Sequence, residues 1–350
     1  RGLLCVAWNL TKGAMMKLPS DIREVRAFTH KYVAKNDRRA AFSYFATFAV
    51  YFAALILGIW AVLQGNYWIA APMSLLVAAT TVRLYVIQHD CGHGSFFTTR
   101  KLNELAGHGL SLPSLSPFLT MRYNHDMHHK HVGNLDHRED GEVFTMTLRE
   151  WNEAGSGKRL FYRAYRNPVL MMVAGALFTY FIRYRWPKNT SKVGVRGVLL
   201  HNLALALFLA LIYAFAGWAG VIFLLVSQTI GGILGVFQVY LQHNFEDTYW
   251  DRRPDLDPQV AALVGSSALN LGWWWDLFTG NIAYHDIHHF NPRIPLYNLR
   301  RCHFDLDEMF EMNRIGWPEA FASFRLKLWD EDSERLVPFP ETDRVAIPAE

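Results

Sequence analysis

Residues 67–93 read YWIAAPMSLLVAATTVRLYVIQHDCGH, and this stretch decides how the chain folds. Up to Gln88 it carries one charged residue, Arg83, and it is long enough for a bilayer-spanning helix. It then runs directly into His89 and His93. Because residues four apart share one face of a helix, we expect a spanning helix that continues past the membrane surface and presents both imidazoles on one side.

The chain contains three further apolar stretches of membrane-spanning length. They are residues 42–63, 198–219 and 221–241, and none of them carries Asp, Glu, Lys or Arg. The links are short, residues 64–66 in the first pair and Gly220 in the second. These stretches predict two transmembrane hairpins, residues 41–88 and residues 197–241.

Lys and Arg gather at the outer ends of both predicted hairpins and are absent from the links. They are Lys35, Arg38 and Arg39 before the first hairpin, and Arg183, Arg185, Lys188, Lys192 and Arg196 before the second. Because cytoplasmic loops are enriched in Lys and Arg, both hairpins are expected to enter from the cytoplasm and return to it. The terminal segments, residues 1–40 and 242–350, then lie in the cytoplasm. The net charge of +4 suits this basic face and gives no reason to expect nucleic acid.

A fifth apolar stretch, residues 167–182, is shorter and begins next to a proline. If it crossed the membrane, His243 would emerge on the face opposite His89, and one metal site could not collect both. We therefore predict an interfacial or re-entrant helix. The predicted fold is an all-α polytopic membrane protein with four transmembrane helices in two hairpins. A helical cytoplasmic cap, formed by residues 89–196 and 242–350, holds the histidines.

Nine of the fifteen histidines form three short boxes and one position after the second hairpin. They are His89 and His93; His125, His128 and His129; His285, His288 and His289; and His243. Neutral imidazole suits iron, zinc, copper or nickel, and ligand type alone does not choose among them. Nine ligands exceed what one ion accepts, but they divide between two ions with positions left open. The sequence therefore predicts a dinuclear metal site, and the other six histidines are interpreted as ordinary packing or surface residues.

An aspartate follows the first histidine of every box: Asp90, Asp126 and Asp286. Because one residue is about 100° around a helix, these carboxylates should not join the ligand face of their own box. One interpretation is that each accepts the free N–H of a histidine from a neighbouring box. The other is a solvated or helix-capping aspartate.

Four further motifs accompany the boxes. They are residues 133–136 (GNLD), 165–168 (YRNP), 242–250 (QHNFEDTYW) and 278–281 (FTGN). With these motifs the chain resembles the membrane-bound fatty acid desaturase family, in particular bacterial acyl-lipid desaturases of the delta-5 and delta-12 type. The resemblance runs from Leu84 to His303 and implies a bacterial inner-membrane enzyme.

The resemblance also implies the chemistry. The eight box histidines and His243 are expected to hold two iron ions, cycling between Fe2+ and Fe3+, with O2 as co-substrate. The substrate is a fatty acyl chain, carried by a lipid, an acyl carrier protein or CoA, or as the free acid. Electrons come from an external donor such as ferredoxin or cytochrome b5, because the chain has neither a haem motif nor a cysteine cluster for iron and sulfur.

Three residues outside the boxes are candidates for contact with the substrate or its carrier. Trp275, shortly before the third box, is interpreted either as a wall of an acyl tunnel or as part of an interfacial aromatic belt. Arg163 and Arg166 are interpreted either as contacts to a carrier phosphate or as ordinary cytoplasmic-side cations.

The reaction outcome stays open at this level. A hydroxylase, an acetylenase and an oxidative decarboxylase that yields a terminal alkene would share the ligands, topology and cofactors of a desaturase. A metal transporter is a different class of protein. It would favour ionisable groups at mid-membrane, whereas the boxes here lie beyond the helix ends.

Overall fold

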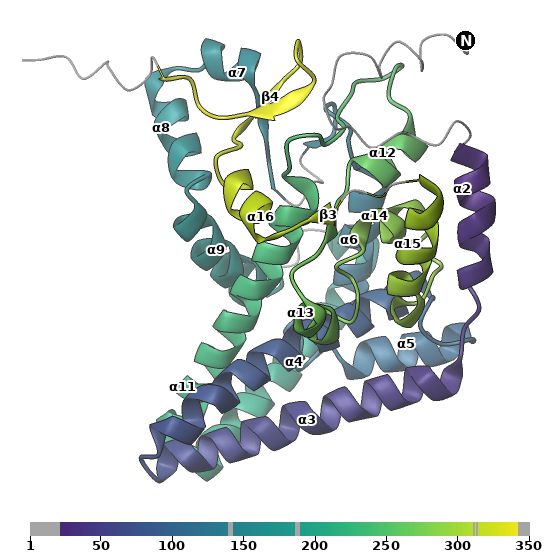
Figure 1. The fold of residues 1–350 in the computed structure, drawn as a ribbon. Helices are drawn as coiled ribbons and strands as arrows, with labels where there is room; N and C mark the ends of the chain where they lie inside the picture. Colours follow the sequence, from purple (N-terminus) through teal and green to yellow (C-terminus); the bar gives the residue numbers. More distant parts are fainter. Residues whose placement is uncertain (1–21, 139–142, 186–189, 311, 313, 342–350) are drawn as a thin grey trace, which may run out of the picture.

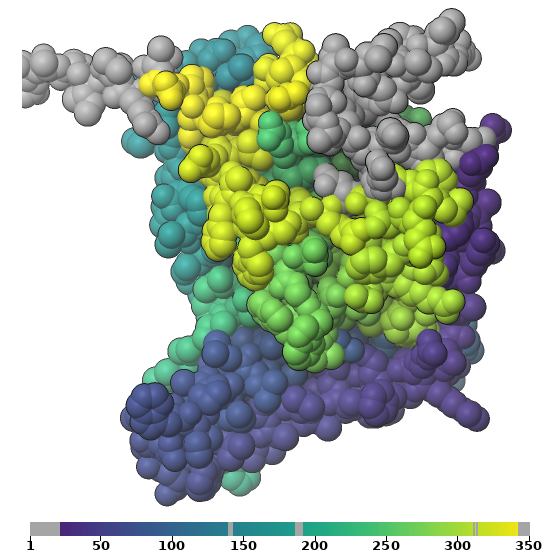
Figure 2. Space-filling view, in the orientation of Figure 1, coloured from purple at the N-terminus to yellow at the C-terminus, as the bar shows by residue number. Residues whose placement is uncertain are grey.

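The computed structural model describes residues 22–138, 143–185, 190–310, 312 and 314–341. The described chain is mostly helical, as predicted, and its three longest helices are α3 (Asp37–Leu63), α4 (Tyr67–His93) and α11 (Val195–His243). These helices extend to one side, and the shorter elements gather at the other end as a cap (Figure 1). Figure 2 shows α3 and α4 as the purple and blue arm beneath that cap.

Short helices form most of the cap. They are α2 (Ile22–Thr29), η2 (His30–Tyr32), α5 (Arg100–Gly109), α6 (Phe118–His131), α7 (Leu148–Glu153), α8 (Ser156–Tyr165), α9 (Pro168–Leu177), η4 (Phe178–Arg183), α10 (Thr190–Val193), α12 (Pro258–Val264), α13 (Trp273–Phe278), α14 (His285–Phe290), α15 (Leu296–Phe310) and α16 (Trp317–Ser323). An all-helical fold was predicted, but the described residues also include five strands. Each has only two or three residues.

The strands tie distant parts of the cap together. β1 (Met146–Thr147) pairs parallel with β4 (Leu328–Asp330), which pairs antiparallel with β5 (Arg335–Val337), giving the order β1-β4-β5. β2 (Ala268–Leu269) pairs parallel with β3 (Arg314–Ile315). Pairings this short carry no periodic signal in the sequence, because alternation needs four or more residues to be recognised.

Three described helices, α3, α4 and α11, are long and apolar enough to cross a membrane. α3 and α4 pack on each other and are joined by residues 64–66. Gly65 turns the chain with a φ of 69°, a conformation that glycine adopts at little cost. Asn66 caps α4, its side-chain oxygen accepting the N–H of Ile69.

Helix α11 is a helical hairpin. Its 49 residues would span about 70 Å if straight. However, Lys192, just before it, lies over the Tyr123 ring of α6, and its last residue, His243, has Nε2 3.2 Å from Nε2 of His128 on the same α6. The chain reverses at Gly217, whose φ and ψ of 58° and −158° are not helical.

The turn predicted at Gly220 is therefore misplaced. Gly217 has open space where a Cβ would stand and adopts the left-handed φ. Gly220 is buried after the turn, where an added Cβ would lie 2.6 Å from that of Ala216 and 3.0 Å from Ile212. The second glycine thus permits close approach of the two arms, while the first makes the reversal.

The apolar stretch at 167–182 forms α9 and the single π-turn η4, and it is shorter than the three candidate spans. It packs on the second arm of α11, where an added Cβ on Gly232 would lie 3.0 Å from that of Ala176. Asn167 caps it by accepting N–H groups of Val169 and Leu170. Its interfacial or re-entrant placement stays a prediction.

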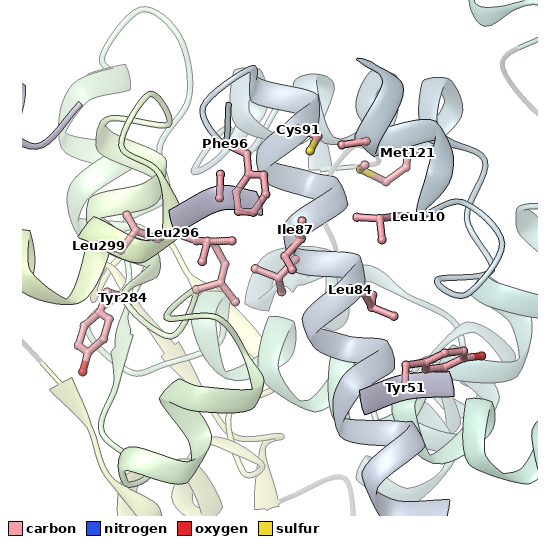
Figure 3. Close-up of a cluster of buried hydrophobic side chains, with 14 of the residues drawn as sticks. Tyr51, Leu84, Ile87, Cys91, Phe96, Leu110, Met121, Tyr284, Leu296 and Leu299 are labelled. Atoms are coloured by element: carbon pink, nitrogen blue, oxygen red, sulfur yellow. The ribbon is translucent and has the colours of Figure 1, made fainter. Parts of the chain in front are cut away.

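The core runs without interruption from the long helices into the cap. In Figure 3, Leu84 and Ile87 lie along α4 between Tyr51 of α3 and cap residues such as Leu296. The α4 pillar is fixed further because Asp90 Oδ2 accepts the N–H of Leu296, 2.7 Å away. The histidines at the end of α4 therefore belong to a helix that is packed firmly against the cap.

Candidate metal centre

The structure brings all nine predicted histidines together. The last turn of α4 supplies His89 and His93, α6 supplies its whole box, α14 supplies the third box, and α11 ends at His243. The nine divide into two groups, and within each group one nitrogen per residue lies within 4.8 Å of every other. They are His89, His93, His125, His129 and His288 in the five-histidine group, and His128, His243, His285 and His289 in the four-histidine group.

In the five-histidine group the Nε2 atoms face one another. His125 Nε2 lies 2.7 Å from Nε2 of His89 and 2.8 Å from that of His129. His129 Nε2 in turn lies 3.0 Å from Nε2 of His288. The Nε2 of His93 is buried and has no hydrogen-bond partner among the described residues.

The four-histidine group has the same character. His128 Nε2 lies 3.2 Å from Nε2 of both His243 and His289. His285 Nε2 lies 3.2 Å from that of His243 and 3.0 Å from that of His289. Each ring therefore points its outer nitrogen at a shared centre.

The second and third boxes do not each point all of their histidines at one centre. Boxes two and three both split between the groups, because the residues four apart stay together and the middle histidine joins the other group. Residues four apart differ by about 40° around a helix, whereas residues three apart differ by about 60° in the other direction. A box of this spacing therefore spreads its three side chains widely enough to serve two ions.

Hydrogen bonds cannot satisfy these nitrogens. A neutral imidazole nitrogen offers either one N–H or one lone pair, yet His125 Nε2 faces two other ring nitrogens at once. Burial, reinforced by neighbouring imidazoles, holds the pKa of His125, His129 and His288 well below the usual range. The same causes lower the pKa of His285 and His289. Neutral histidine is the metal-binding form, so the residues fit two transition-metal ions.

The three aspartates that follow the first histidine of each box have different surroundings. Asp90 is fully buried, and its Oδ1 lies 3.6 Å from Nδ1 of His89 in its own box. Asp286 Oδ2 lies 3.2 Å from Nδ1 of His303, a histidine outside the boxes. Asp126 is exposed on α6. Asp286 therefore contacts a histidine outside the boxes, and the contacts expected between these aspartates and histidines of neighbouring boxes stay a prediction.

His303 is a residue that reasoning from spacing missed. It was interpreted as an ordinary residue, but it is fully buried on α15 between Asp286 and the Tyr284 ring, whose centroid is 4.9 Å away. It therefore lies directly behind the third box. No local pattern marks it, since α15 meets α14 only in the folded chain.

The predicted role of Arg166 at a carrier phosphate is wrong. Arg166 has no exposed surface. Its guanidinium donates to the Phe144 carbonyl, Thr145 Oγ1, Asn244 Oδ1 and the Leu326 carbonyl. Because Asn244 follows His243, Arg166 fixes the end of α11 and so positions that histidine.

The other two candidates are also packed against the protein. The Arg163 guanidinium lies 4.5 Å from the Phe339 ring centroid and 5.1 Å from that of Trp151. Trp275 is 2% exposed, with ring centroids of Phe237 and Trp317 at 5.6 and 6.0 Å. Trp275 thus belongs to an aromatic cluster where α13 meets α11.

A small cavity reaches the four-histidine group. His128 and His243 line it together with Arg138, Thr145 and Asn244. His131 also lines it and stacks on His137 with ring centroids 4.6 Å apart. The four-histidine group therefore borders a small cavity.

Comparison with known proteins agrees with this geometry. The family model for fatty acid desaturases matches residues 66–320, which include all nine histidines. A fatty acid desaturase of Bacillus subtilis is 32% identical over 81% of this chain and 82% of its own length. An sn-1 oleoyl-lipid 12-desaturase of Synechocystis is 27% identical over 69% of each chain, and an omega-3 fatty acid desaturase of Nicotiana tabacum is 27% identical over 81% of this chain and 76% of its own.

The relatives named as desaturases indicate that this chain is an oxidoreductase. This chain belongs to the fatty acid desaturase family.

Proposed function

We propose that the protein is an O2-dependent di-iron desaturase that introduces a double bond into a fatty acyl chain. The observation that carries this proposal is the division of nine buried histidines into two adjoining groups whose facing nitrogens hydrogen bonds cannot satisfy. The five-histidine group would hold one iron ion and the four-histidine group the other.

The metal supplies what side chains cannot. Two bound iron ions would provide the oxidising power, with O2 as co-substrate, to remove hydrogen from unactivated methylene groups. The two substrate hydrogens, together with two electrons and two protons from outside, account for the reduction of one O2 to two water molecules.

The chain's own residues hold and shape the site. Burial keeps the imidazoles neutral and the α4 pillar holds His89 and His93 in place, while Arg166 and Asn244 fix the end of α11 beside His243. The four-histidine group has one ligand fewer and borders the cavity, so it is the side on which a small molecule can approach.

The membrane arrangement that supports this function has four spanning helices. α3 and α4 form one hairpin and the two arms of α11 the other, with the cap on the cytoplasmic side of a bacterial inner membrane. In support of it, the end of α4 and the end of α11 meet at one centre, as they must if both leave the membrane on the same side.

The substrate and the electron donor are part of the proposal. The relatives named as oleoyl-lipid desaturases support an acyl chain carried by a membrane lipid. The chain has three cysteines, and Cys91 and Cys302 are buried and unpaired, so electrons would come from a separate protein such as ferredoxin or cytochrome b5.

Expression in a bacterium, followed by mass spectrometry of its fatty acids and hydrocarbons, tests the proposal. We expect a new double bond inside an acyl chain, absent with His285→Ala and retained with His108→Ala, an exposed histidine away from the centre. A hydroxy acid, an alkyne or a terminal alkene as the product would overturn desaturation in favour of one of its rivals.

A further inference from the structure

Large apolar side chains are exposed on the part of the cap formed by α13 and α16. They are Trp273 (76% exposed), Trp274 (46%), Leu277 (59%), Trp317 (37%) and Phe321 (62%), and together they are called the α13–α16 patch. Soluble surfaces rarely gather so many large apolar side chains in one place, so the patch calls for a partner.

The patch is continuous and firmly supported. The rings of Trp274 and Trp317 stack with centroids 6.2 Å apart, and those of Trp317 and Phe321 lie 6.0 Å apart. Beneath them, buried Trp275 contacts Trp317 and also Phe237 of α11. The exposed aromatic residues therefore stand on a packed base that reaches a long helix.

Arg83 fixes the position of the patch along the length of α4. This residue of α4 donates through Nη1 to the Leu277 carbonyl, and through Nε to Thr47 Oγ1 of α3 at 3.1 Å. A guanidinium on a spanning helix is held near the headgroups, because burying its charge in hydrocarbon is costly. The C-terminal end of α13, bonded to it, is therefore held at the same depth. Figure 1 shows α13 beside α4 and below α16.

Large apolar side chains are also exposed on α3 next to the residue that Arg83 contacts there. Ser43 of α3 accepts a hydrogen bond from Arg83 Nη2 at 3.2 Å. The neighbouring Phe42 and Phe45 are 77% and 67% exposed. Apolar surface is thus present on both sides of Arg83, on α3 and on the cap. Tryptophan is enriched at this depth, where its ring meets both acyl chains and headgroups.

We propose that the α13–α16 patch is a membrane-anchoring surface, which inserts into the headgroup region of a phospholipid bilayer. The inference rests on the membrane embedding proposed above, but not on the reaction. Anchoring of the patch would affect the position of the metal site, since α13 precedes the third histidine box by only a short turn. Anchoring α13 would hold that box at a constant height above the acyl chains.

An acyl carrier or a second copy of the chain fits the patch less well. None of its five members is charged, and the nearby Asp276 is engaged with the Tyr284 hydroxyl at 2.8 Å and with Arg300 Nε at 3.3 Å. A patch that offers aromatic rings and no free charge, at the depth of a guanidinium on a spanning helix, matches a lipid surface.

The test uses the full chain in phosphatidylcholine vesicles, labelled with bimane at one cysteine. Phe321→Cys and Trp273→Cys place the label in the patch, and Asp332→Cys places it on the exposed turn between β4 and β5 as the matched control. All three carry Cys5→Ser, and the buried Cys91 and Cys302 are protected from labelling. Quenching by lipids with a nitroxide high on the acyl chain is compared with quenching by aqueous iodide.

We expect lipid nitroxide to quench both patch labels at least about threefold more strongly than the control, with the reverse order for iodide. Equal iodide quenching at all three sites would overturn the proposal, because the patch would then face water. Protection of the patch labels from both quenchers would also overturn it, in favour of contact between two copies of the chain. The assay needs neither iron nor turnover, so its failure is distinguishable from failure of the desaturase proposal.

Discussion

His128 and His288 occupy equivalent positions in their boxes, and each joins the group formed mainly by the other box. His128 stands with His285 and His289, whereas His288 stands with His125 and His129. The exchange links α6 and α14 through both groups, so neither centre can form without both helices. The arrangement explains why two boxes carry three histidines each.

The exchange predicts the result of removing either residue. His128→Ala should leave the five-histidine group intact, and His288→Ala should leave the four-histidine group intact. Each variant should retain about half of the iron and lose desaturation by more than about 100-fold, since a direct ligand matters at least as much as its supporting contacts. Iron per chain is measured by mass spectrometry on purified protein, and full iron occupancy in both variants would contradict the assignment.

Asp286 and His303 are expected to support the third box. Asp286→Asn or His303→Phe should weaken iron retention about 10- to 100-fold, as loss of outer contacts typically does. Asp126→Asn is the matched control, because Asp126 is exposed. Iron retention is followed during titration with a chelator. If all three variants behaved like the unchanged protein, the contact between Asp286 and His303 would have no role at the centre.

Arg166 should matter for stability rather than for substrate binding. Arg166→Met removes the guanidinium that donates to Asn244 Oδ1, Thr145 Oγ1 and the Phe144 carbonyl, and it leaves the Leu326 carbonyl with only the 3.4 Å bond from Asn244 Nδ2. This loss should cost more than about 2 kcal/mol. Arg163→Met removes the contacts with the Phe339 and Trp151 rings and should cost about 0.5–1 kcal/mol. Thermal unfolding in detergent measures both. Equal melting temperatures for the two variants would argue against the buried role of Arg166.

The reversal of α11 should depend on Gly217. Gly217→Ala places a Cβ on a residue with a φ of 58° and should destabilise the protein by about 1–2 kcal/mol. Gly197→Ala in the same helix meets nothing within 4 Å and should instead stabilise it by about 0.5–1 kcal/mol. A Gly217→Ala variant as stable as Gly197→Ala would place the turn elsewhere.

The metal-free protein should lose stability as the pH falls. Burial keeps the pKa of His125, His129, His285, His288 and His289 well below 6.5, so the unfolded chain binds protons at a higher pH than the folded chain does. Stability is then fully present above the unfolded pKa of about 6.5 and declines below it, by up to about 1.4 kcal/mol per histidine and pH unit. Melting temperatures at pH 7.5 and pH 5.5 test this. The control is a variant that lacks these five histidines. If the melting temperature fell between the two pH values no more than it does in this control, the prediction would be contradicted.

Local features of the fold were predictable. The long helices α3 and α4 follow from apolar length with a short polar link between them. The reversal of α11 was predicted at the wrong glycine, because Gly217 and Gly220 are both single glycines in an apolar stretch. Only the packing of the two arms shows which glycine adopts the left-handed φ and which one gives room.

The sequence predicted which histidines form the candidate centre, but not how they divide between its two groups. Spacing identified the nine histidines, yet the partition between groups depends on how α6 and α14 face each other. The contacts of Asp286 with His303 and of Arg166 with Asn244 join elements far apart in the chain. No periodicity within one segment can signal such pairs, because they exist only once the helices pack.

The central claim is that this chain holds two iron ions in its histidine groups. Elemental analysis of the purified full chain, expressed with ample iron, tests it most directly. The account predicts about two iron ions per chain, and none of them retained when one ligand of each group is replaced, as in His125→Ala with His285→Ala. One iron per chain, another metal in place of iron, or iron that survives the double substitution would contradict it.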